Sequence, residues 1–166
     1  MANVTFKDSP VQTLADLPKV GSQAPGFVLC GADLEDVSLA DFAGKTVVLN
    51  VALSFDTGTC QNSARRFNEI ATRVKDVVVL NISMDLPFAQ ARFCNAEGLS
   101  DVINLSAFRS PAFGEGYGLT ILDGPLNGLL SRAVVLIDAT GKILYTEQVP
   151  EMSHEPEYEA VLNHLD

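Results

Sequence analysis

The chain has 166 residues, of which 47% are hydrophobic and 19% are charged, a balance typical of one globular domain and not of a disordered segment. Its 21 acidic residues outnumber its 11 basic residues, and the formal net charge of −10 repels phosphate backbones, which argues against nucleic acid as a partner. No apolar stretch approaches the roughly 20 residues needed to cross a bilayer, so we expect no membrane partner.

The first 20 residues are polar and contain Pro10 and Pro18, so they do not resemble a secretory signal, and we expect a cytoplasmic protein. We expect residues 1–20 to form an N-terminal extension, with a β-hairpin as one form that it could adopt. The chain contains no internal repeat or low-complexity tract, so residues 1–166 are predicted to form a single domain. The next apolar stretch, Phe27-Val28-Leu29-Cys30, resembles a short strand, and Cys30 is expected to be a core residue without a chemical role.

A strand, a helix and a second strand are predicted between residues 46 and 83. Thr46–Leu53 and Val77–Ser83 are almost continuously apolar and rich in β-branched residues, which is typical of strands covered on both faces. Asp56 or Thr57 could cap the intervening helix. These elements form a βαβ unit, whose strands should be parallel and joined by a right-handed crossover. The apolar side chains of the helix recur at helical spacing: Ala64, Phe67, Ile70, Ala71 and Val74.

A second helix is predicted from Pro87 to about Glu97. Asp85 is a candidate N-cap, Pro87 suits the first turn, and Gly98 follows as a C-terminal stop. Beyond this helix, Val102–Leu105 could add another strand. The glycine-rich segment from Phe113 to Gly128 is expected to form loops.

The C-terminal part is predicted to form a β-hairpin and a closing helix. Ala133–Asp138 and Lys142–Val149 read as strands, and Ala139-Thr140-Gly141 reads as the turn between them. The tail Glu155–Leu165 places its apolar residues on one side of a helix. A parallel βαβ unit, a later hairpin and a closing helix are the element order of a thioredoxin-like fold. The predicted class is therefore α/β, with a central mixed β-sheet flanked by helices.

Cys60 is the candidate reactive residue, because it follows a central strand and begins a helix. Sites in α/β sheets form beyond the carboxyl ends of the strands. At a helix start, unpaired backbone N–H groups and the helix dipole stabilise an anion, which favours a thiolate. The alternative is an inert core cysteine, since free cysteine is among the most buried residue types. Position alone leaves both interpretations open.

Several motifs resemble those of a known family. Thr57-Gly58-Thr59-Cys60 is similar to the Thr-x-x-Cys part of the peroxiredoxin signature Pro-x-x-x-Thr-x-x-Cys. Four longer stretches resemble the bacterial thiol peroxidase subfamily: Asp85-Leu86-Pro87-Phe88-Ala89-Gln90, Arg92-Phe93-Cys94-Asn95-Ala96-Glu97-Gly98, Asp123-Gly124-Pro125-Leu126 and Val37-Ser38-Leu39-Ala40-Asp41-Phe42-Ala43-Gly44-Lys45. The resemblance runs from about Gly21 to the C-terminus.

The resemblance implies a role for four residues. Cys60 would be the peroxidatic cysteine, oxidised to a sulfenic acid, and Cys94 of the same subunit would be the resolving cysteine that condenses with it to an intramolecular disulfide. Thr57 would direct its hydroxyl at the thiolate and the incoming peroxide. Arg132 would stabilise the charge that develops on the departing alkoxide, a task that suits a permanently charged side chain with several donors.

The resemblance also implies the substrates and partners. Leu53, Phe55 and Thr59 would contact the substrate, either an alkyl hydroperoxide or hydrogen peroxide. Leu53 stands where the signature has proline, so it can give apolar cover but lacks the fixed φ of proline. Thioredoxin would be the reductant and the protein would be a homodimer. Nothing in the sequence calls for a metal or another cofactor.

The formation of this disulfide should require movement. Two cysteines on separate helices bond only when their Cα atoms approach within about 7 Å. We therefore expect the first turn around Cys60, the Pro87–Glu97 helix, or both, to unwind locally.

Other interpretations of the cysteines lead to different functions. A packed helix cysteine is the alternative for Cys94. A cysteine hydrolase would need a general base, and the only histidines, His154 and His164, lie in the tail. A dithiol–disulfide oxidoreductase of thioredoxin type is disfavoured because the chain has no Cys-x-x-Cys motif. The remaining alternative is a non-enzymatic redox sensor or interaction module on a thioredoxin-like scaffold.

Overall fold

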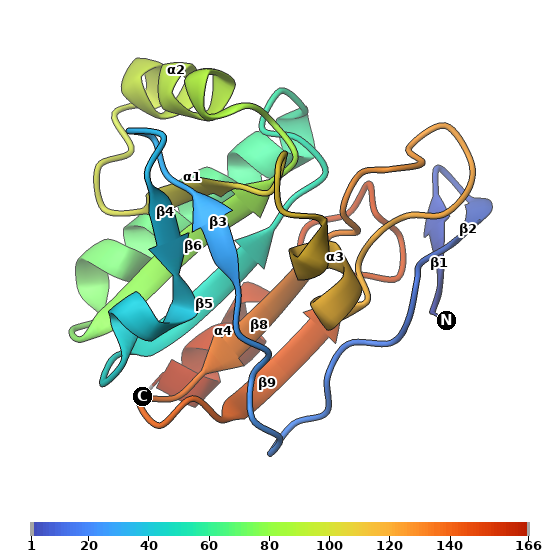
Figure 1. Ribbon diagram of the computed structural model, residues 1–166. Helices are drawn as coiled ribbons and strands as arrows, with labels where there is room; N and C mark the ends of the chain where they lie inside the picture. The colour runs from blue at the N-terminus through green and yellow to red at the C-terminus, as the bar shows by residue number, and fades with distance from the viewer. Residues whose placement is uncertain (1, 166) are drawn as a thin grey trace.

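The computed structural model describes residues 2–165 and is built around a mixed sheet of seven strands (Figure 1). The strands occur in the order β4-β3-β7-β6-β5-β8-β9. No helix in residues 2–165 combines the length and the apolar character needed to span a membrane. The strands of the sheet are β3 (Val28–Cys30), β4 (Asp36–Ser38), β5 (Thr46–Val51), β6 (Val77–Ser83), β7 (Ile103–Ser106), β8 (Ala133–Ile137) and β9 (Ile143–Gln148).

Helices cover both faces of this sheet. They are the short 3₁₀ helix η1 (Leu39–Phe42) and the α-helices α1 (Gly58–Arg73), α2 (Pro87–Glu97), α3 (Pro111–Tyr117) and α4 (Tyr158–Leu165). The predicted α/β class, with a mixed sheet flanked by helices, is confirmed. The strands β1 (Asn3–Phe6) and β2 (Ser9–Gln12) form a separate antiparallel pair at the N-terminal end.

The parallel centre of the sheet arises from the predicted βαβ unit. The strand β5 pairs in parallel with β6, and β6 pairs in parallel with β7, whereas β8 pairs antiparallel with β5 and β9. Neighbouring residues of β5 contribute to different clusters, with Val48 packing beneath α1 and with Val47 and Leu49 packing on the side of α3. Both faces are therefore apolar, which explains the nearly continuous hydrophobic pattern of β5.

The predicted N-cap is confirmed for the helix α1 and is wrong for the helix α2. Thr57 is the N-cap of α1, which confirms one of the two expected residues. The helix α2 has the predicted bounds and ends at Gly98, whose φ of 67° is left-handed. The N-cap of α2 is Leu86, however, so the predicted cap at Asp85 is wrong. Asp85 lies one residue too early, and its carboxylate binds a distant loop that is described below.

Two C-terminal predictions also need correction. The expected loop from residue 113 contains most of the helix α3, which begins at Pro111 and buries Phe113 and Tyr117 on one side. Gly114 is required inside this helix, because a Cβ there would collide with the side chain of Thr120. The closing helix α4 begins at Tyr158 instead of Glu155. The backbone N–H of Glu157 donates to the carboxylate of Glu147, which ties the preceding residues to β9.

Candidate active site

Cys60 is the third residue of α1, where the chain has just left the carboxyl end of β5 (Figure 1). Its side chain is fully buried. The sulfur accepts a hydrogen bond of 3.1 Å from Nη1 of Arg132. The unpaired N–H groups of the first helical turn and the adjacent guanidinium both stabilise negative charge at this sulfur. These groups direct positive charge and donors at the Cys60 sulfur.

Arg132 is itself buried, with only 1% of its surface exposed, and it directly precedes β8. Its Nε donates to the carbonyl of Met152 at 2.9 Å, while Nη1 donates to Cys60. Within residues 2–165, no carboxylate forms an ion pair with Arg132. Because a buried charge without a counter-ion is costly, the hydrogen bonds of Arg132 to the Cys60 sulfur and the Met152 carbonyl are the contacts that compensate its burial.

Asp85 holds the loop that leads into α1. Its Oδ1 accepts a hydrogen bond of 2.7 Å from the Ser54 hydroxyl, and its Oδ2 accepts one of 2.8 Å from the Phe55 N–H. Asp85 follows the end of β6, so it fixes the active-site loop to a neighbouring parallel strand. This role was missed in the sequence, because the partners lie about 30 residues away and leave no local signal.

The two threonines near Cys60 have different hydrogen-bond partners. The Thr57 hydroxyl donates to the carbonyl of Ser54 at 2.8 Å, so its proton is directed into the turn and not at the Cys60 sulfur. The oxygen of Thr57 retains lone pairs that can accept a hydrogen bond from a bound peroxide. The Thr59 hydroxyl donates to the carbonyl of Ser153 at 3.0 Å, which ties the helix start to the loop after β9.

A cavity of about 210 Å³ lies over the start of α1. Its charged side chains are both cationic, Lys7 at the turn between β1 and β2 and Arg132 directly before β8. Two of the three predicted substrate-contacting residues, Leu53 and Thr59, line it. Phe55 does not; its ring stacks on Phe93 of α2 with centroids 6.0 Å apart. Cys60 is reached from this cavity through Arg132, which both lines the cavity and contacts the Cys60 sulfur.

Glu151 fastens the N-terminal hairpin to this site. Its carboxylate accepts hydrogen bonds from the Asp8 N–H at 2.8 Å, from the Thr5 hydroxyl at 3.1 Å and from the Ser153 N–H at 2.7 Å. Burial alone would raise the pKa of Glu151, but these donors outweigh it and lower the pKa from 4.5 to about 2. Sequence reasoning missed this residue. It acts on the same loop whose carbonyls bind Arg132 and Thr59.

Cys94 lies in α2 and is 8% exposed. Burial raises the pKa of its thiol, and a hydrogen bond of 3.0 Å from Nδ2 of Asn104 partly opposes that rise. Cys94, Cys60 and Cys30 are all free thiols. Cys30 is fully buried in β3.

The two candidate redox thiols are held over different strands. The partner of Cys94 is in β7, whereas the partner of Cys60 directly precedes β8. Three strand spacings separate β7 from β8 in the sheet, which amounts to about 14 Å. A disulfide requires Cα atoms within about 7 Å.

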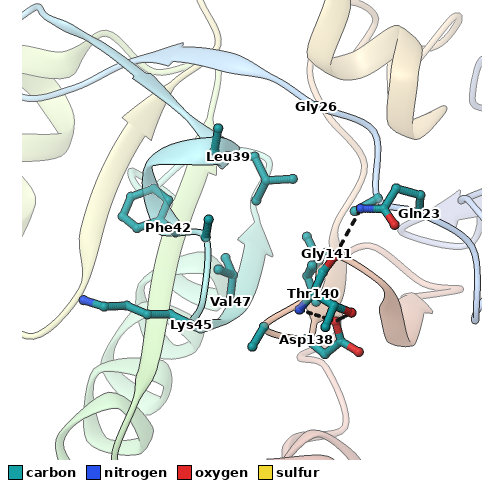
Figure 2. A pocket seen from close by; sticks show the side chains of 14 residues that line it. Gln23, Gly26, Leu39, Phe42, Lys45, Val47, Asp138, Thr140 and Gly141 are labelled. Atoms are coloured by element: carbon teal, nitrogen blue, oxygen red, sulfur yellow. Dashed lines mark hydrogen bonds between the residues drawn. The ribbon is translucent and has the colours of Figure 1, made fainter.

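A second cavity, of about 300 Å³, lies at the opposite end of the sheet (Figure 2). Leu39 and Phe42 of η1 line one side, and the turn between β8 and β9, where Gln23 approaches Thr140, lines the other. Val47, at the start of β5, also lines it, whereas α1, which carries Cys60, begins beyond the other end of that strand. This cavity is therefore separate from the reactive cysteine. In residues 2–165, no three His, Cys, Asp or Glu side chains form a group that could hold a metal ion.

Comparisons with known proteins agree with this geometry. The model of the Redoxin family matches residues 19–162. The thiol peroxidase of Mycobacterium tuberculosis (strain ATCC 25618 / H37Rv) is 51% identical over 162 residues, which cover 98% of this chain and 97% of that protein. The crystal structure of a peroxiredoxin-like protein from Aquifex aeolicus is similar with a TM-score of 0.94 and 37% identity, covering 99% of this chain and 96% of that one. A thiol peroxidase from Chromobacterium violaceum has a TM-score of 0.87 and 25% identity, covering 97% and 93% of the two chains.

Proposed function

The chain belongs to the redoxin family and is a thiol-dependent peroxidase of it, and from this we propose that Cys60 is the thiol that attacks the peroxide. The observation that carries the proposal is the buried pair of Cys60 and Arg132, joined at 3.1 Å. The pair lies beside a cavity of about 210 Å³, a size that suits an alkyl hydroperoxide or hydrogen peroxide.

In the first step, the Cys60 thiolate attacks the terminal oxygen of the hydroperoxide. An S–O bond forms, the O–O bond breaks, and the departing alkoxide takes up a proton to leave as an alcohol, or as water from hydrogen peroxide. Cys60 becomes a sulfenic acid. Arg132 and the N–H groups of the first turn of α1 stabilise the charge that moves onto the leaving oxygen. The Thr57 oxygen accepts a hydrogen bond from the O–H group of the bound peroxide and orients it, and that proton stays on the oxygen transferred to Cys60.

In the second step, we propose that Cys94 resolves the oxidised Cys60. The Cys94 thiol condenses with the sulfenic acid, an S–S bond forms and water leaves. The two thiols belong to different helices and bind partners in different parts of the sheet, which supports a local unwinding of α2, of the first turn of α1, or of both. The helix α2 is suited to this, because Oε1 of its buried Gln90 has no hydrogen-bond partner within residues 2–165.

The disulfide must then be reduced by an external dithiol, and we propose thioredoxin, acting in the cytosol. We also propose a homodimer, on the basis of an exposed apolar surface formed by Leu86, Phe88 and Phe108. The Ser106 hydroxyl donates to the carbonyl of Asp85, which brings the two segments that carry these side chains together. A native mass measurement that finds only monomers at micromolar concentration would contradict the dimer.

A coupled assay tests the proposed function. Hydroperoxide consumption is followed as NADPH oxidation in the presence of thioredoxin and thioredoxin reductase. We expect turnover by the wild-type protein, background rates for Cys60→Ser, and nearly unchanged rates for Cys30→Ser, since Cys30 is buried away from the site. A Cys60→Ser variant that keeps its activity would overturn the assignment of Cys60.

A further inference from the structure

Three asparagines occupy paired positions in neighbouring parallel strands. In the sheet register, Asn50 of β5 is opposite Asn81 of β6, and Asn81 is opposite Asn104 of β7. Nδ2 of Asn50 donates to Oδ1 of Asn81 at 2.9 Å, and Nδ2 of Asn81 donates to Oδ1 of Asn104 at 3.4 Å. Asn50 and Asn81 are buried, so each amide depends on its neighbour for the hydrogen bonds that water would otherwise supply.

This asparagine ladder (Asn50, Asn81 and Asn104) connects the two helices that carry the redox thiols. At one end, the hydroxyl of Ser63 donates to Oδ1 of Asn50 at 3.0 Å, and Ser63 lies three residues after Cys60 in α1. At the other end, Nδ2 of Asn104 donates to the sulfur of Cys94 at 3.0 Å. Each amide accepts on its oxygen and donates from its nitrogen in the same direction, so the ladder directs a donor at Cys94.

We propose that the asparagine ladder is a latch that holds Cys94 in its resting position and thereby limits the rate at which Cys94 resolves oxidised Cys60. This inference rests on the proposed function. Cys94 must leave Asn104 before its sulfur can reach the sulfenic acid, so the Asn104 hydrogen bond is present in the resting state and absent at the moment of attack. Because this hydrogen bond must break before the disulfide can form, it raises the activation free energy of disulfide formation.

The hydrogen bond between Asn104 and Cys94 is one of few polar contacts in residues 2–165 between α2 and the strands of the sheet. Besides Cys94, the polar contact of α2 with the strands is made by Gln90, whose Nε2 donates to the Ser83 hydroxyl and to the Leu105 carbonyl at 3.0 Å each. A single hydrogen bond contributes enough to change an equilibrium about five- to tenfold. We therefore expect the loss of the Asn104 donor to accelerate disulfide formation by about that factor.

The latch has a consequence for oxidative damage. A sulfenic acid that waits for Cys94 can meet a second hydroperoxide and be oxidised to a sulfinic acid, with release of a second alcohol or water. Slow resolution favours this outcome at high peroxide concentration. Releasing the latch should therefore lower the fraction of Cys60 that reaches the sulfinic state.

Two variants of Asn104 test the proposal. Asn104→Ala removes the donor, and Asn104→Asp removes it while keeping an oxygen that can accept from Asn81. Asn68→Ala is the matched control, because Oδ1 of Asn68 accepts from the Asp101 N–H at 3.0 Å and so ties α1 to the segment before β7 without contacting Cys94. Rapid quench with a thiol-blocking reagent, followed by intact-mass analysis, gives separate rates for Cys60 oxidation, disulfide formation and sulfinic acid formation.

We expect both Asn104 variants to oxidise Cys60 at the wild-type rate, to form the disulfide about five- to tenfold faster and to accumulate less sulfinic acid. The control should match the wild type in all three rates. In a Cys60→Ser background, the pH at which Cys94 becomes reactive toward an alkylating reagent should move upward in both Asn104 variants and not in the control. Asp33 lines the same cavity as Cys94. Because Asp33 is unchanged in every variant, its charge does not account for a difference between the Asn104 variants and the control.

One outcome would overturn the latch, and another would overturn the proposed resolving role of Cys94. If both Asn104 variants oxidise Cys60 normally but form the disulfide at or below the wild-type rate, the latch is overturned and the proposed function stands. If the wild-type protein forms no disulfide after Cys60 oxidation, the proposed resolving role of Cys94 fails before the latch is in question.

Discussion

The guanidinium of Arg132 and the sulfur of Cys60 face each other in a place that solvent does not reach. The planar guanidinium donates to Cys60 and to the Met152 carbonyl from different nitrogens at the same time. An ammonium on a flexible stem cannot reproduce that fixed geometry. We predict that Arg132→Lys lowers kcat/KM for hydroperoxide by about 10²–10³-fold, as expected for the loss of a preorganised donor. Steady-state peroxide assays would contradict this if the variant stayed within threefold of the wild type while its circular dichroism was unchanged.

Leu53 is the position where this chain departs from the peroxiredoxin signature. Its side chain is buried and lines the cavity, and within residues 2–165 its backbone N–H makes no hydrogen bond that a proline would remove. A proline would also fix φ near −65° in the loop that positions the site. We predict that Leu53→Pro raises peroxidase turnover by about twofold or more. An unchanged or lower turnover number, measured in the coupled assay, would count against it.

Individual residues differ in how far the sequence reveals them. The position of Cys60 at a helix start follows from the strand and helix patterns alone, whereas the approach of Arg132 was expected only from resemblance. Asp85 was misread as a helix cap because two of its partners, Ser54 and Phe55, are far away in sequence. The asparagine ladder did leave a signal, one asparagine inside each of three similar apolar runs: Val48-Leu49-Asn50-Val51, Val79-Leu80-Asn81-Ile82 and Val102-Ile103-Asn104-Leu105.

The β1–β2 hairpin is held over the cavity by the carboxylate of Glu151. Since the pKa of Glu151 is lowered from 4.5 to about 2 in the folded protein, its ionised form stabilises the fold at pH values above about 4.5, and that stabilisation is lost as the pH falls toward 2. We predict that Glu151→Gln lowers Tm at pH 7 and that the deficit shrinks between pH 4.5 and pH 2. Thermal melts across this range test the sign; a deficit that stays constant with pH would show that the charge of Glu151 is not responsible.

The helix α2 is the element that we expect to move. Its anchors include the Asn104–Cys94 hydrogen bond, the Gln90 contacts, the stack of Phe93 on Phe55 and the ion pair of Glu97 with Arg65 of α1. We predict that amides of Pro87–Glu97, of the first turn of α1, or of both, exchange at least tenfold faster in the oxidised protein than in the reduced protein. Hydrogen exchange read by mass spectrometry gives this directly. Identical protection of both segments in the two redox states would defeat the idea of local unwinding.

At the level of elements, buried strands were easier to predict than helices rich in glycine. The strand β6 and the helix α2 have the bounds expected from their apolar runs and terminal signals. The helix α3 was expected to be a loop, because Gly114 and Gly116 lower intrinsic helix propensity. Its stability comes from tertiary packing, in which Phe113 and Tyr117 contact the ring of Phe27, and that packing is not visible in a local window.

At the scale of the whole molecule, the strand order determines how far apart the residues that bind Cys60 and Cys94 lie. The order β7-β6-β5-β8 separates Asn104, the partner of Cys94 in β7, from Arg132, the partner of Cys60 directly before β8, and we expect Cys60 and Cys94 to meet only if one of their helices unwinds. The mixed sheet itself was predictable from the element order. The pairing of particular residues across it, such as Asn81 with Asn104, depends on register, which strands that are apolar on both faces specify only weakly.

Intact-mass analysis after addition of one equivalent of hydroperoxide tests the central claim, the redox pair of Cys60 and Cys94, most directly. The reduced wild-type protein should lose two hydrogens as the disulfide forms, and peptide mapping should place the bond between Cys60 and Cys94. The Cys94→Ser variant should instead gain one oxygen at Cys60. A Cys60 that stays reduced in both proteins would contradict the account.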